Sequence, residues 1–103
     1  MTTEVRVARL SELARDMGTV VNAGGKELAL FHVGGACYAI ANECTHTGGP
    51  LAEGNLNGDE IECPWHAACF NIKTGKASGP PAKTDVKTYP VVVRGDEVFV
   101  QFE

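Results

Sequence analysis

Residues 42–66 read NECTHTGGPLAEGNLNGDEIECPWH, and this stretch decides how the chain is interpreted. One residue separates Cys44 from His46, and two residues separate Cys63 from His66 after sixteen intervening positions. Thiolate sulfur and imidazole nitrogen are the donors that proteins offer to zinc and to iron–sulfur centres. Each half of the stretch supplies one donor of each kind, which indicates a metal centre built from two loops.

Two kinds of centre fit these four donors. Two cysteines and two histidines are a standard zinc set, so a zinc-binding interaction module is one reading. Zinc modules usually pair cysteine with cysteine and histidine with histidine, whereas each loop here mixes the two. The mixed pattern suits a two-iron centre, in which both loops give their cysteine to one iron and their histidine to the other. We favour the two-iron reading and keep zinc as an alternative.

The segment from about 42 to 81 differs in composition from the rest of the chain. It holds three of the four cysteines, two of the three histidines, four of the five prolines and the only tryptophan. So many turn-forming residues favour an ordered, loop-rich subdomain inserted between strands, and a metal centre would hold it together.

Outside this segment, short β-like runs alternate with Gly, Asn, Asp and Pro, which is typical of an all-β sandwich. We expect strands at 4–10, 26–33, 36–41, 86–93 and 98–102. Gly34-Gly35 predicts a two-residue hairpin turn, Asn57-Gly58-Asp59 predicts a second hairpin between Leu56 and 60–62, and residues 94–97 predict a third turn. Residues 11–17 predict at most one or two helical turns.

Length and charge limit the class of protein. With 103 residues we expect one domain, 1–103, acting as a monomer. A net charge of −4 disfavours nucleic-acid binding, since such domains are usually basic. We find no export signal and no apolar run that could cross a membrane, so we expect a cytoplasmic protein whose cysteines bind metal or are free thiols rather than disulfides.

Cys44-Thr45-His46 and Cys63-Pro64-Trp65-His66 resemble the C-x-H and C-x-x-H signature of Rieske proteins. The likeness extends over nearly the whole chain, and its further matches are Asn42-Glu43, 51–58, Phe70, Thr74-Gly75-Lys76, Gly79-Pro80-Pro81 and Val98-Phe99-Val100. The chain most resembles the small ferredoxins of bacterial aromatic ring-hydroxylating dioxygenase systems.

This resemblance implies the Rieske fold: stacked antiparallel sheets forming a base sandwich, with the inserted subdomain at the tip. It implies one [2Fe–2S] cluster ligated by Cys44, His46, Cys63 and His66. It also implies partners: a flavin-containing NAD(P)H reductase that donates electrons and a terminal oxygenase that accepts them. By resemblance, Gly79-Pro80-Pro81 packs over the cluster.

The chain departs from the respiratory Rieske proteins at several positions. Gly49 and Trp65 stand where those proteins carry a disulfide, and Ala67 replaces a common glycine. High-potential members place serine and tyrosine hydroxyls where Ala68 and Phe70 stand here. Because neither residue donates a hydrogen bond to a cluster sulfur, we expect a reduction potential near the low end of the Rieske range.

The remaining chemistry-bearing residues indicate a carrier rather than an enzyme. A mononuclear iron oxygenase site needs two histidines and a carboxylate, and only His32 is left after the cluster is assigned. We interpret Cys37 as a buried thiol, Cys69 as structural and His32 as a partly exposed strand residue.

Two further expectations concern partners. A small Rieske-like subunit of an assimilatory nitrite reductase is the alternative to a dioxygenase ferredoxin. In either role, acidic residues within or beside the cluster segment should border a docking face, and these are Glu43, Glu53, Asp59, Glu60 and Glu62.

Overall fold

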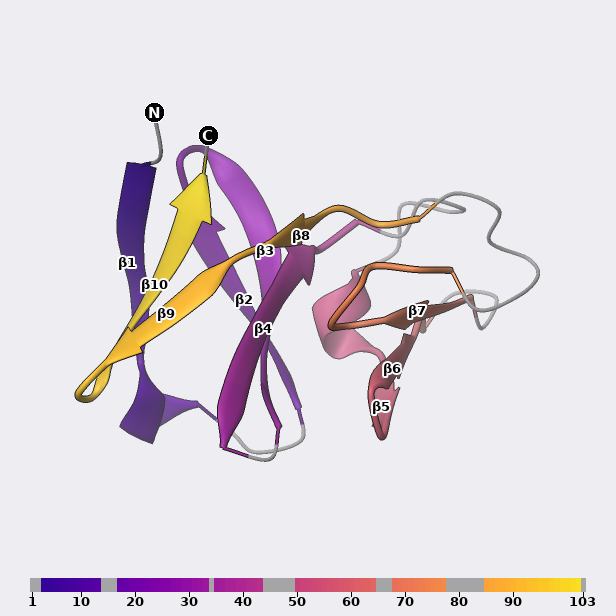
Figure 1. Cartoon of the computed structure of the whole chain (residues 1–103). Helices are drawn as coiled ribbons and strands as arrows, with labels where there is room; N and C mark the ends of the chain where they lie inside the picture. The colour runs from indigo at the N-terminus through magenta and orange to yellow at the C-terminus, as the bar shows by residue number, and fades with distance from the viewer. Residues whose placement is uncertain are drawn as a thin grey trace.

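The structure is a computed structural model that describes residues 3–13, 17–33, 35–43, 50–64, 68–77 and 85–102. Within these ranges the chain forms ten strands, two short 3-10 helices and three antiparallel sheets (Figure 1). The all-β class predicted from the sequence is therefore confirmed. No helix among the described residues is long and apolar enough to cross a membrane.

The first sheet joins the two ends of the chain, in the strand order β1-β10-β9. Its strands are β1 (Thr3–Arg9), β10 (Glu97–Phe102) and β9 (Val91–Arg94). The alternation at 4–10 thus correctly predicts a strand, although its pairing with β10 shifts register between Arg6 and Ala8. The predicted turn before the last strand is also confirmed, and it places β9 beside β10.

The second sheet has the strand order β2-β3-β4-β8. Its strands are β2 (Gly18–Ala23), β3 (Lys26–Val33), β4 (Ala36–Ala41) and β8 (Thr88–Tyr89). The bounds of β3 and β4 match the prediction. The sequence patterns did not predict β2, whose side chains alternate between buried and exposed only over its last residues.

The prediction of a single strand at 86–93 is wrong, because two strands occupy this run. Pro90 divides this run into β8, which pairs with β4, and β9, which pairs with β10. Proline has no N–H to donate to a strand ladder, so pairing is interrupted there and the chain passes from one sheet to the other.

The third sheet is small and has the order β5-β6-β7. Its strands are β5 (Asn55–Asn57), β6 (Glu60–Glu62) and β7 (Cys69–Asn71), and the 3-10 helix η2 (Leu51–Glu53) precedes them. The hairpin predicted around Gly58 is confirmed, while β7 was not predicted. The other 3-10 helix, η1 (Leu10–Glu12), lies at the start of the short helical segment predicted at 11–17.

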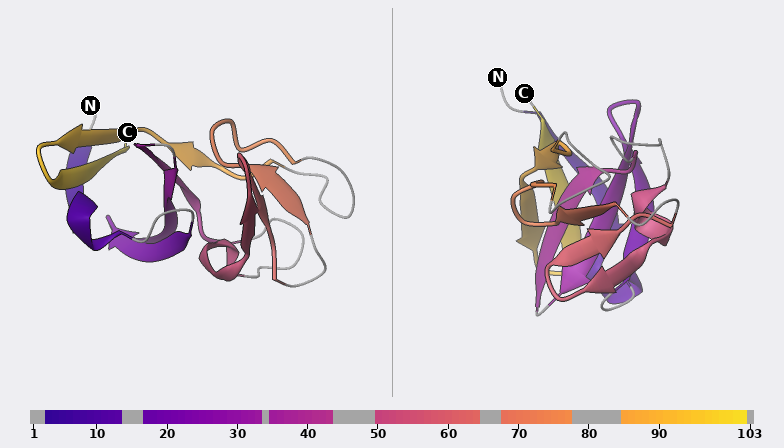
Figure 2. Two further views of the ribbon diagram at one scale, coloured as in Figure 1. Left: turned by 90° about the horizontal axis from the view of Figure 1, so that it is seen from below. Right: turned by 90° about the vertical axis from the view of Figure 1, so that its right-hand side faces the viewer.

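Two groups of buried side chains hold these sheets together. One group, which includes Leu28, Leu30 and Val98, lies between the two larger sheets, which face each other in Figure 2. The second group joins Phe31 and Ile40 of the second sheet to Ile61 and Phe70 of the third. The small sheet is therefore packed onto the second sheet through a shared apolar core.

Candidate metal centre

Cys63 is the predicted ligand that the structure describes, and it lies in the connection between β6 and β7. It follows Glu62 at the end of β6 and is 1% exposed. Its backbone N–H donates a 2.7 Å hydrogen bond to the carbonyl of Ala68, and Glu62 pairs with Cys69 in the ladder. The residues on either side of 65–67 thus belong to one hairpin, β6–β7.

Segment 44–49, which contains the predicted ligands Cys44 and His46, is flanked by residues that pair with each other. Glu43 and Pro50 form an isolated antiparallel bridge. The N–H of Leu51 donates to the carbonyl of Asn42 at 2.8 Å. The two ends of the segment therefore lie next to each other where η2 begins.

A third segment, 78–84, is closed in the same way. Phe70 bridges to Ala77, whose N–H donates to Oδ1 of Asp85 at 2.9 Å. The carbonyl of Gly75 accepts the N–H of Val86 at 2.8 Å. This segment contains Gly79-Pro80-Pro81, which the resemblance predicts to pack over the cluster.

All three closures share the second apolar core. Its members include Leu51 and Ala52 after the first segment, Cys63 and Ala68 around the second, and Val86 after the third. This core includes residues of β6 and β7, and the small sheet lies at the end of the fold away from β1, β9 and β10 (Figure 1). Residues far apart in the sequence are thus gathered at one end of the fold.

Several residues singled out from the sequence lie outside the described part of the chain. They are Cys44, His46, Gly49, Trp65, His66, Ala67, Gly79, Pro80 and Pro81. Two thiols and two imidazoles are the donor set of a Rieske cluster, and the burial of Cys63 in a closed hairpin fits a ligand position. The complete ligand set stays a prediction.

The cysteines outside the signature have different surroundings. Cys37 on β4 is half-buried rather than fully buried, packs against the core between the larger sheets, and has its thiol pKa raised by burial. Cys69 is also half-buried, and burial, followed by the negative charges of Glu62 and Glu60, raises the pKa of its thiol. Both shifts favour the protonated form of the thiol.

His32 lies beside Cys37 in the β3–β4 pair and is half-buried, as expected for a partly exposed strand residue. Its Nδ1 atom is buried and has no hydrogen-bond partner among the described residues.

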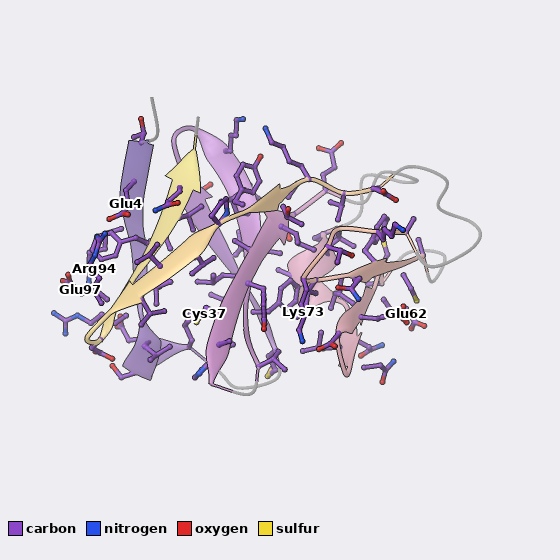
Figure 3. All side chains as sticks on the ribbon, in the orientation of Figure 1. Glu4, Cys37, Glu62, Lys73, Arg94 and Glu97 are labelled. Atoms are coloured by element: carbon purple, nitrogen blue, oxygen red, sulfur yellow. The ribbon has the colours of Figure 1, made fainter. Side chains whose placement is uncertain are left out.

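The acidic residues near the candidate centre differ in their freedom to meet a partner. Glu43 and Glu53 are exposed, while Glu60 and Glu62 are half-buried. Asp59 lies 3.4 Å from the Lys73 ammonium. Glu62 lies on the small sheet, whereas Glu4, Arg94 and Glu97 gather at the opposite end of the molecule (Figure 3).

Residues 3–90 match the sequence model of the Rieske [2Fe–2S] domain family, so the chain belongs to this family. It therefore carries a [2Fe–2S] cluster. It is 45% identical over 83 residues to the ferredoxin component of the naphthalene 1,2-dioxygenase/salicylate 5-hydroxylase systems of Ralstonia sp., covering 81% of this chain and 80% of the relative. Its relatives are electron-transfer components, and the chain is a Rieske electron carrier rather than an oxygenase.

Solved structures agree with this assignment. The ferredoxin of carbazole 1,9a-dioxygenase from Nocardioides aromaticivorans IC177 matches with a TM-score of 0.91 and 37% identity over 95% of this chain and 96% of that one. The ferredoxin of a carbazole 1,9a-dioxygenase oxygenase–ferredoxin complex matches with a TM-score of 0.87 and 36% identity over 93% and 99%. A nitrite reductase small subunit, 24% identical over 95% and 97% with a TM-score of 0.82, shares the fold.

Proposed function

We propose that this chain shuttles single electrons from a flavin-containing NAD(P)H reductase to a terminal ring-hydroxylating oxygenase, as a monomer in the cytoplasm. The observation that carries the proposal is the match over 93% of the chain to a ferredoxin solved in complex with its oxygenase. The nitrite reductase subunit remains the alternative. Its 24% identity supports a common fold and adds nothing on partners.

The proposed ligands are Cys44, His46, Cys63 and His66, within a cluster-binding subdomain of about 42–81. When bound, the cluster accepts and releases one electron. The chain contributes the buried position of Cys63, which excludes water from one donor, and the three closed segments that share the core. Support for the subdomain is that these closures connect residues on either side of 44–49, 65–67 and 78–84.

We also propose a reduction potential near the low end of the Rieske range, which extends from about −150 to +300 mV. Ala68 and Phe70 are both fully buried in the core around Cys63. Neither side chain carries a donor that could stabilise the extra negative charge of the reduced cluster. A low potential suits transfer from a flavin to an oxygenase.

Docking should depend on the acidic residues beside the cluster segment, because a shuttle needs fast and weak association guided by charge. Glu62 immediately precedes Cys63, so its charge lies near the proposed centre. Replacing Glu62 with Gln should slow reduction by the reductase and weaken the dependence of the rate on ionic strength.

Glu97 supplies the matched control, since it is a half-exposed carboxylate that pairs with Arg6 at the other end of the molecule (Figure 3). Glu97→Gln should leave both the rate and its salt dependence unchanged. Equal behaviour of the two variants would contradict a docking face at the cluster end.

The functional test combines the protein with the reductase and oxygenase of a ring-hydroxylating dioxygenase system. Stopped-flow absorbance should show NAD(P)H-dependent reduction by the reductase, then reoxidation when oxygenase and aromatic substrate are added, with hydroxylated product formed. Reoxidation only by a nitrite reductase, together with stable co-elution with it on size exclusion, would contradict the proposal and favour the alternative.

A further inference from the structure

Among the described residues, Asn42 is the one polar residue that is buried, with only 4% of its surface exposed. Its amide Nδ2 donates to Oε1 of Glu27 at 2.6 Å, and its Oδ1 accepts the N–H of Ala52 at 2.8 Å. Its backbone is engaged as well, because its carbonyl accepts the N–H of Leu51 and its N–H donates to the carbonyl of Glu27 at 3.3 Å.

These hydrogen bonds connect three separate parts of the chain. Glu27 lies on β3 of the second sheet, Asn42 lies two positions before Cys44, and Ala52 lies in η2 directly after the first ligand segment. A buried amide is costly unless its donors and acceptors are satisfied. The side chain therefore ties both ends of segment 44–49 to the sheet.

The orientation of the amide is fixed by its two partners. A carboxylate oxygen only accepts hydrogen bonds and a backbone N–H only donates one. Nδ2 must therefore face Glu27, and Oδ1 must face Ala52, since the reverse orientation would break both interactions. Ionised Asp, the side chain nearest to Asn in size, offers acceptors only.

We infer that Asn42 is a positioning residue for the cluster: it holds the two ends of segment 44–49 together and anchors them to β3, so that Cys44 and His46 keep the geometry that ligation needs. The inference rests on the proposed ligand assignment. Residues that support metal ligands commonly change metal retention about 10- to 100-fold when they are replaced.

The principal test replaces Asn42 with Asp in the cluster-loaded protein and follows iron release to a chelator together with the EPR spectrum of the reduced protein. An ionised Asp cannot donate to Glu27 and sets a second carboxylate against it. We expect Asn42→Asp to release iron about tenfold faster than the wild type and to broaden the EPR signal. Combining it with Glu27→Gln should return the release rate to within about threefold, because the new amide supplies the missing donor.

Two further variants complete the design. Ser11→Ala removes a 2.8 Å side-chain hydrogen bond to Asp96, in the turn between β9 and β10, and should leave iron release and the EPR signal unchanged. Glu27→Ala removes the acceptor of Nδ2 while leaving the bond to Ala52 intact, and it should speed iron release about threefold. Because Glu27 is exposed, this variant decides the matter if Asn42→Asp does not fold.

The inference is overturned if Asn42→Asp retains iron within about twofold of the wild type, or if Glu27→Gln fails to rescue it. When Asn42→Asp does not fold, an unchanged release rate in Glu27→Ala overturns it. Failure of the proposed function is seen separately, in a wild-type protein that binds zinc and gives no EPR signal on reduction.

Discussion

Gly75 allows a quantitative test of how the third segment is closed. Its φ is +78°, its N–H donates to the carbonyl of Asn71, and its own carbonyl accepts the N–H of Val86. A Cβ at this position would collide with the carbonyl oxygen of Val86 and lie 3.0 Å from Cγ2 of Thr88. Gly75→Ala therefore costs about 1–2 kcal/mol for the left-handed backbone and about 1–3 kcal/mol more for the displaced neighbours.

Gly25 separates these two costs, because its φ of +76° is nearly the same and a Cβ there meets no atom within 4 Å. Gly25→Ala should carry only the backbone cost. For a domain of this size 1 kcal/mol corresponds to about 4–8 °C in the unfolding midpoint. Thermal unfolding of the cluster-loaded proteins at one scan rate should place Gly75→Ala at least about 4 °C below Gly25→Ala. Equal midpoints would refute the close contact between Gly75 and Val86.

Three further predictions concern the cluster ligands, the reduction potential and the Cys37 thiol. A His46→Ala, His66→Ala double variant should lose the cluster, and native iron content and absorption in that variant would show that the ligand assignment is wrong. Ala68→Ser with Phe70→Tyr should raise the reduction potential measured by voltammetry if the two added hydroxyl donors reach the cluster sulfurs, and an unchanged potential would contradict this role. Burial raises the pKa of the Cys37 thiol above its ordinary value of 9.0, so less thiolate is present at any given pH. Alkylation of Cys37, followed by mass spectrometry, should therefore be slower than alkylation of an unstructured cysteine. Equally fast labelling at neutral pH would argue against burial.

The part of the fold that the sequence predicts best is its hairpins. The bounds of β3 and β4 could be predicted because two β-like runs, 26–33 and 36–41, flank Gly34-Gly35, and so short a hairpin connection fixes the register. β2 and β7 were not predicted, since each owes its strand structure to a partner: β2 pairs with β3, and β7 pairs with β6. The division at Pro90 was missed because strand-forming residues stand on both sides of it, Thr88 and Tyr89 before it and three valines, 91–93, after it.

The proposed ligands of the candidate site could be predicted from the sequence, whereas the residues that support them could not. Cysteine and histidine at short spacing are rare enough outside metal centres that the four proposed ligands stand out in the sequence. The supporting residues do not, because their roles depend on long-range contacts. Asn42 meets Glu27 fifteen positions away, and Asp85 meets Ala77 eight positions away. An Asn at the end of a strand hints at a side chain bonded to nearby backbone, but it does not identify the partner.

The central claim is that this chain carries electrons through a [2Fe–2S] cluster with mixed cysteine and histidine ligation. Metal and sulfide analysis of the purified wild type, combined with EPR after one-electron reduction, tests it most directly. The account predicts two irons and two acid-labile sulfides per chain, a signal from one unpaired electron, and a potential below zero at neutral pH. One zinc per chain with no signal on reduction would contradict it, and a potential well above zero would contradict its placement between a flavin reductase and an oxygenase.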